Sequence, residues 1–539
     1  MHWFDELLAQ VRAHVGAKQD LVINGGLSVS GLQHVGRLRG EIVLSHCLAR
    51  ALREEGRTVT QGLVQYTQDQ WKGKGWQISQ FPGETGKGYV GWRLIDVPDP
   101  HGCHGNWVDH YWAEFSSHMP AYAPDVRVTS TTDLYRRQDM KEMIADLAGR
   151  AEAVRAVVNK YRERRPYPEG WIPFEPYCKA CKRVGSARAL RIIGTESAEY
   201  ACECGDAGTS SLEFGKLNWR LEWPAIWKVL AVDVEPFGKD HAAPGGSRDS
   251  CKDVAQTVMK FTPPFGIPYE WVGIGEKGVD KGDMGSSDAI GFGPASWAAV
   301  GGPEVLRFTY LSVPPSRRIV LDLAKADAYH DAFDAGERAH YGGGTSEEEM
   351  LRARTYALAA MRPLPPNAPF SLPYRHAAFL AQISPDEGRV DWVVRRLKDT
   401  RVLQRDLAAD ERERIGRRMA QARAWVDAYA PENRVVLLER LTDAVRAQLT
   451  KQDRESLMIF AVKAEASNWQ EEAIKEAMVA LTKGEKLPVL TSRFFRDLYL
   501  VLLGTEKGPR AAPFLAVLDK RFVLERLRDA AAEPGEDDA

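Results

Sequence analysis

The pattern of hydrophobic and polar positions predicts an α/β arrangement at the N-terminal end of the chain. Residues 1–16 have the pattern of an amphipathic helix, residues 20–24 (DLVIN) that of a buried strand, and residues 34–56 that of a long helix. A second extended segment opens at residues 57–60. Strand, glycine-rich turn, helix and strand form the opening unit of a doubly wound domain, whose ligands bind beyond the carboxyl ends of the strands. A candidate site therefore lies at residues 25–36.

Breaks in this pattern divide the rest of the chain. The periodicity stops at residues 165–168 (RPYP), a segment with four cysteines follows, and the α/β pattern returns at Lys216. The proline-rich residues 361–373 (MRPLPPNAPFSLP) predict a linker, and nearly everything beyond them has helical periodicity. The final residues, AAAEPGEDDA, are expected to form a disordered acidic tail.

Composition narrows the class of protein. A chain of 539 residues is expected to form two to four domains, and its 44% hydrophobic and 27% charged residues are typical of a soluble globular protein. No apolar run approaches the roughly 18 residues of a membrane span, and the N-terminus lacks the features of a signal peptide. We therefore expect a cytoplasmic protein with no membrane partner. The net charge of −2 leaves nucleic acid open as a partner, because local basic patches matter more than the sum.

Four of the seven cysteines are grouped as Cys-x₂-Cys and Cys-x-Cys, with 20 residues between the pairs. Four thiolates form a tetrahedral zinc set, and a short turn holds the sulfurs of each pair close together. The alternative is four cysteines without a metal. We predict a structural Zn²⁺ site, since four protein ligands leave no open position for catalysis; its ligands would be Cys178, Cys181, Cys202 and Cys204.

The turn SGLQHVGR, residues 30–37, is a candidate phosphate site. A helix N-terminus offers unpaired N–H groups and the positive end of a dipole to an anion. Gly36 would let a nucleotide approach the backbone, and His34 could donate to a phosphate oxygen. The alternative is a glycine-bounded helix start with a surface histidine.

Two further loops carry candidate chemistry. In EPFGKDHAAPGG, residues 235–246, Asp240 could bind ribose hydroxyls and Gly238 leaves room for the nucleotide; alternatively, Asp240 caps the next helix. In VPDPHGCHG, residues 97–105, histidine and cysteine are dense enough to suggest a metal. We interpret this second loop instead as the lining of a pocket, with its histidines as hydrogen-bonding groups.

Taken in order, these segments resemble the class I, archaeal-type lysyl-tRNA synthetases. SGLQHVGRLRGE resembles the first signature of that family, the HIGH box, and GPEVLRFTYL resembles the stretch after its second signature, the KMSKS box. Three further segments are similar to ones distinctive of the family: VPDPHGCHGNW, GKLNWRLEWPAIW and EPFGKDHAAPGGS. The resemblance runs from MHW at the N-terminus to the helical C-terminal part.

This resemblance implies a fold. It implies an α/β Rossmann-type class I catalytic domain with a small zinc-binding insertion, followed by an all-α domain that grips the anticodon end of tRNA. The expected divisions are residues 1–164, the first half of the catalytic domain; 165–215, the zinc-binding insertion; 216–320, the second half with a KMSKS-like loop; 321–365, a connecting helical region; and 366–539, the anticodon-binding-like domain with its acidic tail.

The resemblance also implies a reaction and its residues. ATP with Mg²⁺ would activate lysine as an adenylate, and the lysyl group would pass to tRNA. His34 and Gly36, with Ser30 and Gly31 beside them, would contact ATP, and His34 would stabilise the pentavalent phosphate. Gly238 and Asp240 would hold adenine and ribose. The candidates for the amino-acid pocket are Gly26, Ser28, Asp69, Glu222, Trp223 and His241.

One segment departs from the family pattern. In VDKGDMGSSDAI, residues 279–290, alignment on Met284, Ser286 and Ser287 puts Asp283 and Asp288 where the second signature has lysines. Those lysines would neutralise the pyrophosphate leaving group, so aspartates reverse the sign. Lys277 or Lys281 could reach in from the same loop, and Lys281, Met284, Ser286 and Ser287 are our catalytic candidates here.

A second departure concerns specificity. In VQYTQDQW, residues 64–71, Asp69 is the one acid, although a pocket for a lysine side chain needs groups that satisfy a buried ammonium. Two hypotheses follow. The first is an active lysine–tRNA ligase; the second is a synthetase-like paralogue with another amino acid or acceptor, or a catalytically silent tRNA-binding protein.

The C-terminal helices favour tRNA as a partner under either hypothesis. Five arginines there could contact phosphates, although interleaved acids favour a solvated helix face for most of them: Arg395, Arg396, Arg417, Arg418 and Arg423.

Overall fold

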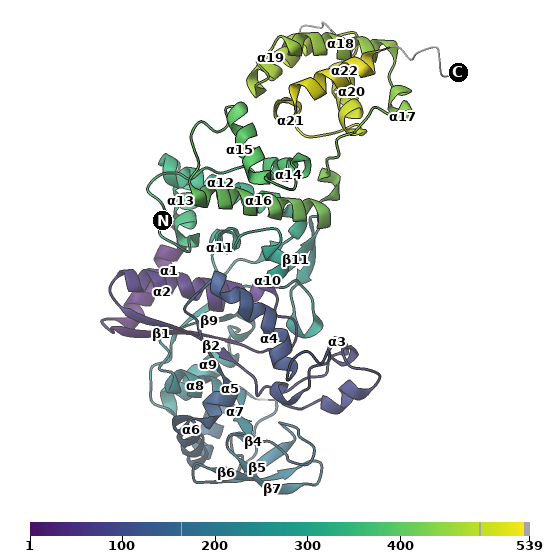
Figure 1. The fold of residues 1–539 in the computed structure, drawn as a ribbon. Helices are drawn as coiled ribbons and strands as arrows, with labels where there is room; N and C mark the ends of the chain where they lie inside the picture. Colours follow the sequence, from purple (N-terminus) through teal and green to yellow (C-terminus); the bar gives the residue numbers. More distant parts are fainter. Residues whose placement is uncertain (163, 484–486, 533–539) are drawn as a thin grey trace. The chain divides into compact units, whose positions relative to one another are not determined.

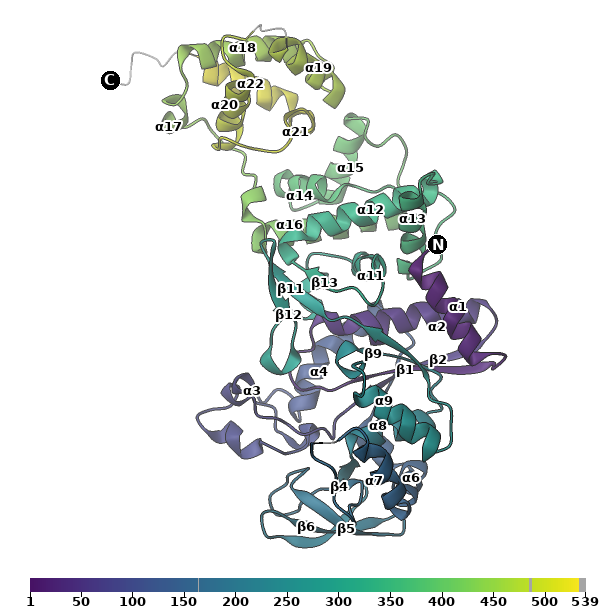
Figure 2. The same ribbon diagram turned by 180° about the vertical axis from the view of Figure 1, so that it is seen from behind.

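The computed structural model describes residues 1–162, 164–483 and 487–532 (Figures 1 and 2). The chain forms two compact units, Met1–Asn367 and Ala368–Ala539. Their boundary falls inside the proline-rich stretch predicted as a linker. Residues 533–539 of the predicted acidic tail lie outside the described residues.

A parallel sheet forms the centre of the first unit. Its five strands have the order β10-β9-β1-β2-β3, and every neighbouring pair is parallel. β1 lies between β2 and β9, so the chain changes direction across the sheet beside β1. In doubly wound folds this switch point is where ligands bind, at the carboxyl ends of the strands. The predicted Rossmann-type fold is confirmed, with the strands β1 (Asp20–Leu27), β2 (Thr58–Gln65), β3 (Arg127–Ser130), β9 (Val234–Gly238) and β10 (Phe265–Tyr269).

Helices pack on this sheet and on the other parts of the first unit (Figure 1). The predicted N-terminal helix is present and buries the face formed by Phe4, Leu8 and Val11. The helices are α1 (Trp3–Val15), α2 (Ser45–Glu54), α3 (Gly75–Ser79), α4 (Trp107–His118), α5 (Thr131–Arg136), α6 (Gln138–Gly149), α7 (Ala151–Asn159), α8 (Trp219–Val229), α9 (Ser247–Thr257), α10 (Pro294–Ala298), α11 (Pro303–Leu311), α12 (Ala326–Gly342) and α13 (Glu347–Ala359).

The helix predicted over residues 34–56 is not a single α-helix. It begins with a 3₁₀ helix, η1 (Val35–Leu38), and continues with a π-helix, η2 (Arg39–Leu44), before α2 starts. All six residues of η2 are buried, including Arg39 and Glu41. The π-helix is rare and frequent at functional sites, and hydrophobic periodicity does not distinguish it from an α-helix.

Smaller sheets complete the first unit. One has the order β12-β11-β13, with β11 (Val272–Glu276), β12 (Val279–Asp283) and β13 (Ile319–Leu321). The predicted zinc-binding insertion contains the antiparallel sheet β5-β6-β7, and β4 within it pairs with β8, which begins at the last residue of the insertion and continues beyond it. These strands are β4 (Phe174–Pro176), β5 (Ala187–Ile193), β6 (Ser197–Cys202), β7 (Ala207–Ser211) and β8 (Gly215–Leu217).

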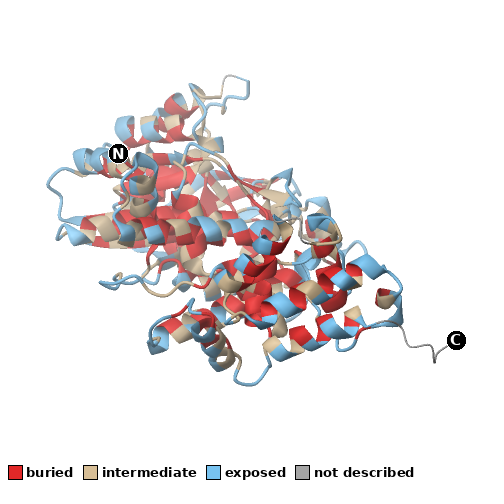
Figure 3. Cartoon of the chain, turned by 90° about the horizontal axis from the view of Figure 1, so that it is seen from above, coloured by how far each residue is buried: buried red, intermediate tan, exposed pale blue. Residues whose placement is uncertain are grey.

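The second unit is helical throughout the residues described, as predicted. Figure 3 shows buried residues gathered on the inner faces of its helices; Tyr374 and Trp425, for example, bring their ring centroids to 5.6 Å. Its helices are α14 (Tyr374–Ile383), α15 (Arg389–Asp399), α16 (Ala409–Ala428), α17 (Asp443–Arg446), α18 (Lys451–Glu465), α19 (Glu471–Thr482), α20 (Thr491–Leu503), α21 (Ala511–Val517) and α22 (Lys520–Ala531). None of the helices described in either unit has the length and apolarity to cross a membrane.

The arginines singled out in α16 have partners within the second unit. Arg418 is buried and donates to the Leu372 carbonyl at 2.8 Å. Arg423 pairs with Asp427 at 2.8 Å, four residues along the same helix. The Arg423 pair agrees with the solvated helix face that the interleaved acids predict, whereas Arg418 is buried and does not lie on such a face.

Candidate active site and metal centres

The turn after β1 lies against two segments distant in sequence. Gln77 of α3 donates to the Ser30 carbonyl at 2.8 Å. A Cβ on Gly31 would lie 2.8 Å from the Trp76 ring and would overlap the carbonyl oxygen of Ser286. The turn, α3 and the KMSKS-like loop therefore meet at the carboxyl end of β1, and only glycine fits between them.

His34 is a buried residue, so the alternative of a surface histidine is wrong. Burial and the nearby Arg37 guanidinium lower the pKa of His34 to about 3, which keeps the imidazole neutral. Its Nδ1 has no hydrogen-bond partner among the residues described. A Cβ on Gly36 would lie 2.9 Å from this nitrogen. A buried ring nitrogen without a protein partner is a group that a bound ligand can satisfy.

The KMSKS-like loop folds against this turn. The short helix η7 (Ser286–Asp288) forms its tip, and Ser286 Oγ accepts a hydrogen bond from Arg37 Nε at 2.7 Å. A Cβ on Gly291 would lie 3.0 Å from Met284 and 3.2 Å from His34. The structure thus brings Met284, Ser286 and the adjoining Ser287 to the predicted phosphate site.

The charges of the loop are balanced by residues outside it. Asp283 pairs with Arg318 at 2.6 Å, and Asp288 pairs with Lys74 at 2.6 Å. Lys281, the catalytic candidate, lies on β12 and pairs with Glu276 of β11 at 3.3 Å. The cation nearest the tip of the loop therefore comes from another segment.

The predicted nucleotide residues at the end of β9 and just after it lie at the same edge of the sheet. Asp240 is in the 3₁₀ helix η6 (Lys239–His241). A Cβ on Gly238 would lie 2.7 Å from Asp240 Oδ1 and 3.3 Å from Trp271 Nε1. The next helix, α9, has Gly246 as its N-cap, so the alternative in which Asp240 caps that helix is wrong.

Aromatic side chains form one wall beside these residues. The Trp223 ring lies 5.2 Å from His241 and 5.1 Å from Trp219, and Trp219 lies 5.4 Å from Tyr66. A Cβ on Gly26 would lie 2.5 Å from Tyr66. Three of the predicted amino-acid residues, Gly26, Trp223 and His241, therefore belong to one chain of contacts, and Ser28 follows one residue after β1 ends.

Two other residues predicted for the amino-acid pocket already have a cationic partner. Lys216 of β8 pairs with Asp69 at 2.5 Å and with Glu222 at 3.0 Å. Tyr135 also donates to Glu222, at 2.7 Å. Burial disfavours the charge on Lys216, but Asp69 and Glu222 together raise its pKa. The ammonium that these acids hold belongs to the protein itself.

A different acid lies at the sheet without such a partner. Glu41 of η2 is buried, and both its carboxylate oxygens accept from the Tyr269 hydroxyl, at 2.6 and 2.7 Å. Glu41 forms no ion pair with the residues described, and burial raises its pKa to about 7. A Cβ on Gly25 would overlap the Glu41 side chain. Sequence reasoning missed this residue, although an acid inside the apolar run GEIVL was a signal.

Comparison with known proteins identifies the family. Residues 1–362 match the family model of class I (K) tRNA synthetases, and residues 428–531 match that of an anticodon-binding domain. The chain belongs to the class I (K) tRNA synthetases. It is 41% identical to a lysine–tRNA ligase of Aeropyrum pernix, over 98% of both chains. It is 31% identical to one of Pyrococcus horikoshii and 30% to one of Thermococcus kodakarensis, each over 98% of this chain and 99% of the relative. The predicted family and its aminoacyl-tRNA ligase class are thereby confirmed.

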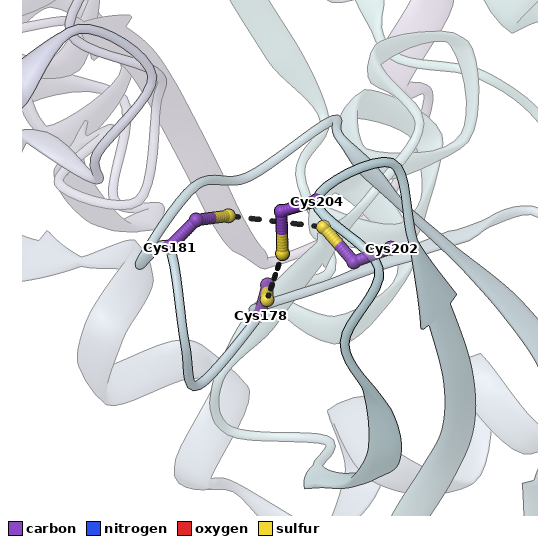
Figure 4. Close-up of side chains that lie close together, drawn as sticks. All are labelled: Cys178, Cys181, Cys202 and Cys204. Carbon is purple, nitrogen blue, oxygen red and sulfur yellow. Dashed lines mark hydrogen bonds between the residues drawn. The ribbon is translucent and has the colours of Figure 1, made fainter.

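The four cysteines of this synthetase come together as predicted (Figure 4). Their sulfurs lie within 4.8 Å of one another, with Cys178–Cys204 at 3.6 Å and Cys181–Cys202 at 3.7 Å. Tetrahedral Zn–S bonds of about 2.3 Å separate the sulfurs by about 3.8 Å. The donor set and its spacing fit zinc.

The synthetase has a second cluster of metal-ligand type. Asp99, Cys103, His104 and His110 bring their ligand atoms within 4.8 Å of one another. His110 Nδ1 lies 3.2 Å from both Asp99 and Cys103, and His104 Nδ1 lies 3.1 Å from Cys103. The sequence interpretation covered residues 97–105 and kept the histidines of that loop, His104 among them, as hydrogen-bonding groups of a pocket; it did not include His110. The missed signal was the spacing, which places all four residues within one short segment that ends in the first turn of α4.

Proposed function

We propose that this synthetase is a lysine–tRNA ligase. It activates lysine with ATP and Mg²⁺ as lysyl-adenylate and transfers the lysyl group to tRNA. Two lines support this: the near full-length similarity to proteins named lysine–tRNA ligase, and the anticodon-binding domain.

The observation that carries the specificity is the buried carboxylate of Glu41. A buried acid is costly unless a cation or several donors satisfy it, and Tyr269 supplies only one hydroxyl. A lysine ammonium would satisfy both groups. We therefore assign the side chain of the substrate to Glu41 and Tyr269, while Gly26, Ser28, Trp223 and His241 remain our proposal for the rest of the pocket.

The nucleotide would bind along the switch point of the sheet. Ser30, Gly31 and Gly36 would lie along the phosphates, and the free Nδ1 of His34 would form a hydrogen bond with an oxygen of the α-phosphate. Gly238 and Asp240 would hold adenine and ribose. Met284, Ser286 and Ser287 would cover the phosphates.

Both ligand clusters are proposed to hold zinc. The cysteine cluster would stabilise the insertion, because its two pairs come from separate turns of the chain. The Asp99 cluster, with its carboxylate, thiol and two imidazoles, has ligands that zinc accepts. It would fix the loop before α4, and metal analysis of the purified protein would give two zinc ions per chain.

The test of the proposed function is ATP–pyrophosphate exchange with each amino acid in turn, with and without tRNA. Among the amino acids tested, only lysine should support exchange. The protein should also charge tRNA with lysine. Exchange with a different amino acid would refute the assignment of lysine.

The sequence of the KMSKS-like loop favours the second hypothesis, a paralogue with another substrate or no catalysis. Asp283 and Asp288 reverse the charge expected at the leaving group. No exchange with any amino acid, even with tRNA present, would support that hypothesis over a ligase.

A further inference from the structure

The first unit supplies a cation to the KMSKS-like loop from outside the loop. Asp288 occupies a lysine position of the second signature, and the ammonium of Lys74 lies 2.6 Å from its carboxylate. The two residues are 214 positions apart in the sequence. An alignment of the loop by itself therefore shows that the lysine of the signature is lost. In the folded chain, Lys74 lies beside that position.

The backbone at Lys74 is held against the first signature. Lys74 is the N-cap residue of α3, and its N–H donates to the Gln77 side chain at 2.7 Å. The same buried Gln77 side chain donates to the Ser30 carbonyl at 2.8 Å. Trp76 packs beside Gly31. These contacts fix where the Lys74 side chain starts, next to the turn that carries His34.

The Lys74 ammonium itself remains able to move. The side chains of Lys74 and Asp288 are 42% and 45% exposed, and an ion pair this exposed contributes little to stability. Two arginines near the loop are more constrained: Arg318 is shared by Asp280 and Asp283, and Arg37 donates to Ser286. Lys281 is also exposed, but it pairs with Glu276 on the neighbouring strand β11 and not with the tip of the loop. Lys74 thus has one weak partner and a flexible four-carbon stem.

We propose that Lys74 replaces the missing signature lysine and binds the pyrophosphate leaving group during amino-acid activation. This inference rests on the proposed function. Asp288 would hold Lys74 beside the site before ATP binds, and Lys74 would leave Asp288 for the triphosphate, which has a larger negative charge.

The step itself is a displacement at the α-phosphorus. A carboxylate oxygen of the amino acid forms a bond to this phosphorus, and the bond from phosphorus to the oxygen bridging to the β-phosphate breaks. The bridging oxygen keeps the electron pair and leaves with pyrophosphate. Lys74 transfers no proton; its positive charge stabilises the negative charge that builds on the leaving group.

The direct test is Lys74→Ala, compared with Lys87→Ala as a matched control. Lys87 is an exposed lysine of the same region, and its ion pair is with Glu84, three residues earlier in the sequence and outside the loop. Lys74→Ala should lower the rate of lysine-dependent ATP–pyrophosphate exchange about 100-fold, as removal of one stabilising group does in other sites, and Lys87→Ala should leave it unchanged. Both variants should keep the melting temperature of the wild type.

A second readout does not depend on activity. Calorimetric titration with inorganic pyrophosphate and Mg²⁺ should show about tenfold weaker binding to Lys74→Ala, because a charge-assisted contact is lost. Asp288→Lys, introduced into Lys74→Ala, returns a lysine to the signature position. The exchange rate of this double variant should be at least about tenfold higher than that of Lys74→Ala.

The outcomes separate the two proposals. Wild-type exchange and wild-type pyrophosphate affinity in Lys74→Ala would overturn the role of Lys74 while leaving the ligase function intact. Absence of amino-acid-dependent exchange in the wild-type chain would instead refute the proposed function.

Discussion

Two acid clusters of the first unit can be compared, and their charges are balanced in opposite ways. We call Asp69 with Glu222 the first cluster and Glu41 with the Tyr269 hydroxyl the second. Asp69 and Glu222 hold an internal cation, Lys216, at 2.5 and 3.0 Å. Glu41 has the Tyr269 hydroxyl instead, and among the described residues no cation pairs with it. Both clusters contain fully buried acids, so both need compensation. The protein compensates the first within its own fold, and the second is the one that we propose binds a cationic ligand.

The largest expected effect comes from removing the charge of the second cluster. Glu41→Gln should lower kcat/KM for lysine in ATP–pyrophosphate exchange about 1000-fold, because the substrate ammonium would be buried without its carboxylate, a loss of about 4 kcal/mol. Steady-state exchange at varied lysine concentration measures this effect. The melting temperature should not fall, since Glu41 forms no ion pair with the described part of the chain.

Asp69→Asn is the matched control for this variant. It removes one acid of the first cluster, while Glu222 still pairs with Lys216. Lysine activation should stay within about threefold of the wild type, because this acid neutralises a residue of the protein. An equal loss of kcat/KM for lysine in Glu41→Gln and Asp69→Asn would contradict the distinction between the two clusters. It would favour Asp69 as a ligand of the substrate.

The next effect is one of stability. Lys216→Met leaves Asp69 and Glu222 without their cation, and breaking a buried pair in this way should reduce the free energy of unfolding by about 3 kcal/mol. Urea denaturation measures this loss. Adding Asp69→Asn and Glu222→Gln to Lys216→Met should recover much of it, since no uncompensated charge would remain. A Lys216→Met protein of full stability would show that this pair does not support the fold.

A smaller effect is expected for Tyr269→Phe. The hydroxyl donates to Glu41 at 2.6 Å, and loss of one hydrogen bond to a charged group should raise the KM for lysine about tenfold. The kcat value should change less, because Tyr269 lies at the side-chain end of the proposed pocket. A fall in kcat at constant KM would instead indicate a role in the reacting complex.

Local patterns in the sequence predicted part of this structure. β1 and the glycine turn after it were predictable because an apolar run followed by glycines is a local signal. The cysteine cluster was predictable for the same reason. The role of Glu41 was not, because its partner Tyr269 is 228 positions away and η2 interrupts the α-helical periodicity.

The pairing of charges in the first acid cluster could not be predicted from the sequence either. Lys216 and Asp69 are 147 positions apart, so the sequence shows an acid in a candidate pocket but not the lysine that already neutralises it. The pairing of Lys74 with Asp288 is equally invisible in one sequence. Long-range pairing of charges, rather than the type of each residue, decides which acids remain for a ligand.

The smallest expected effect is a pH dependence that separates the two clusters. Burial raises the pKa of Glu41 to about 7, against the opposing effects of the Tyr269 hydrogen bond and the Arg37 charge, and Glu235 adds to the rise. Below this value Glu41 is protonated and above it carries the charge that binds an ammonium. The value of kcat/KM for lysine should therefore rise about threefold from pH ~6.5 to pH ~7.5. Glu41→Gln should abolish this rise and Lys216→Met should keep it, because Lys216 belongs to the other cluster; a rise that survives in Glu41→Gln would assign the titration to a different group.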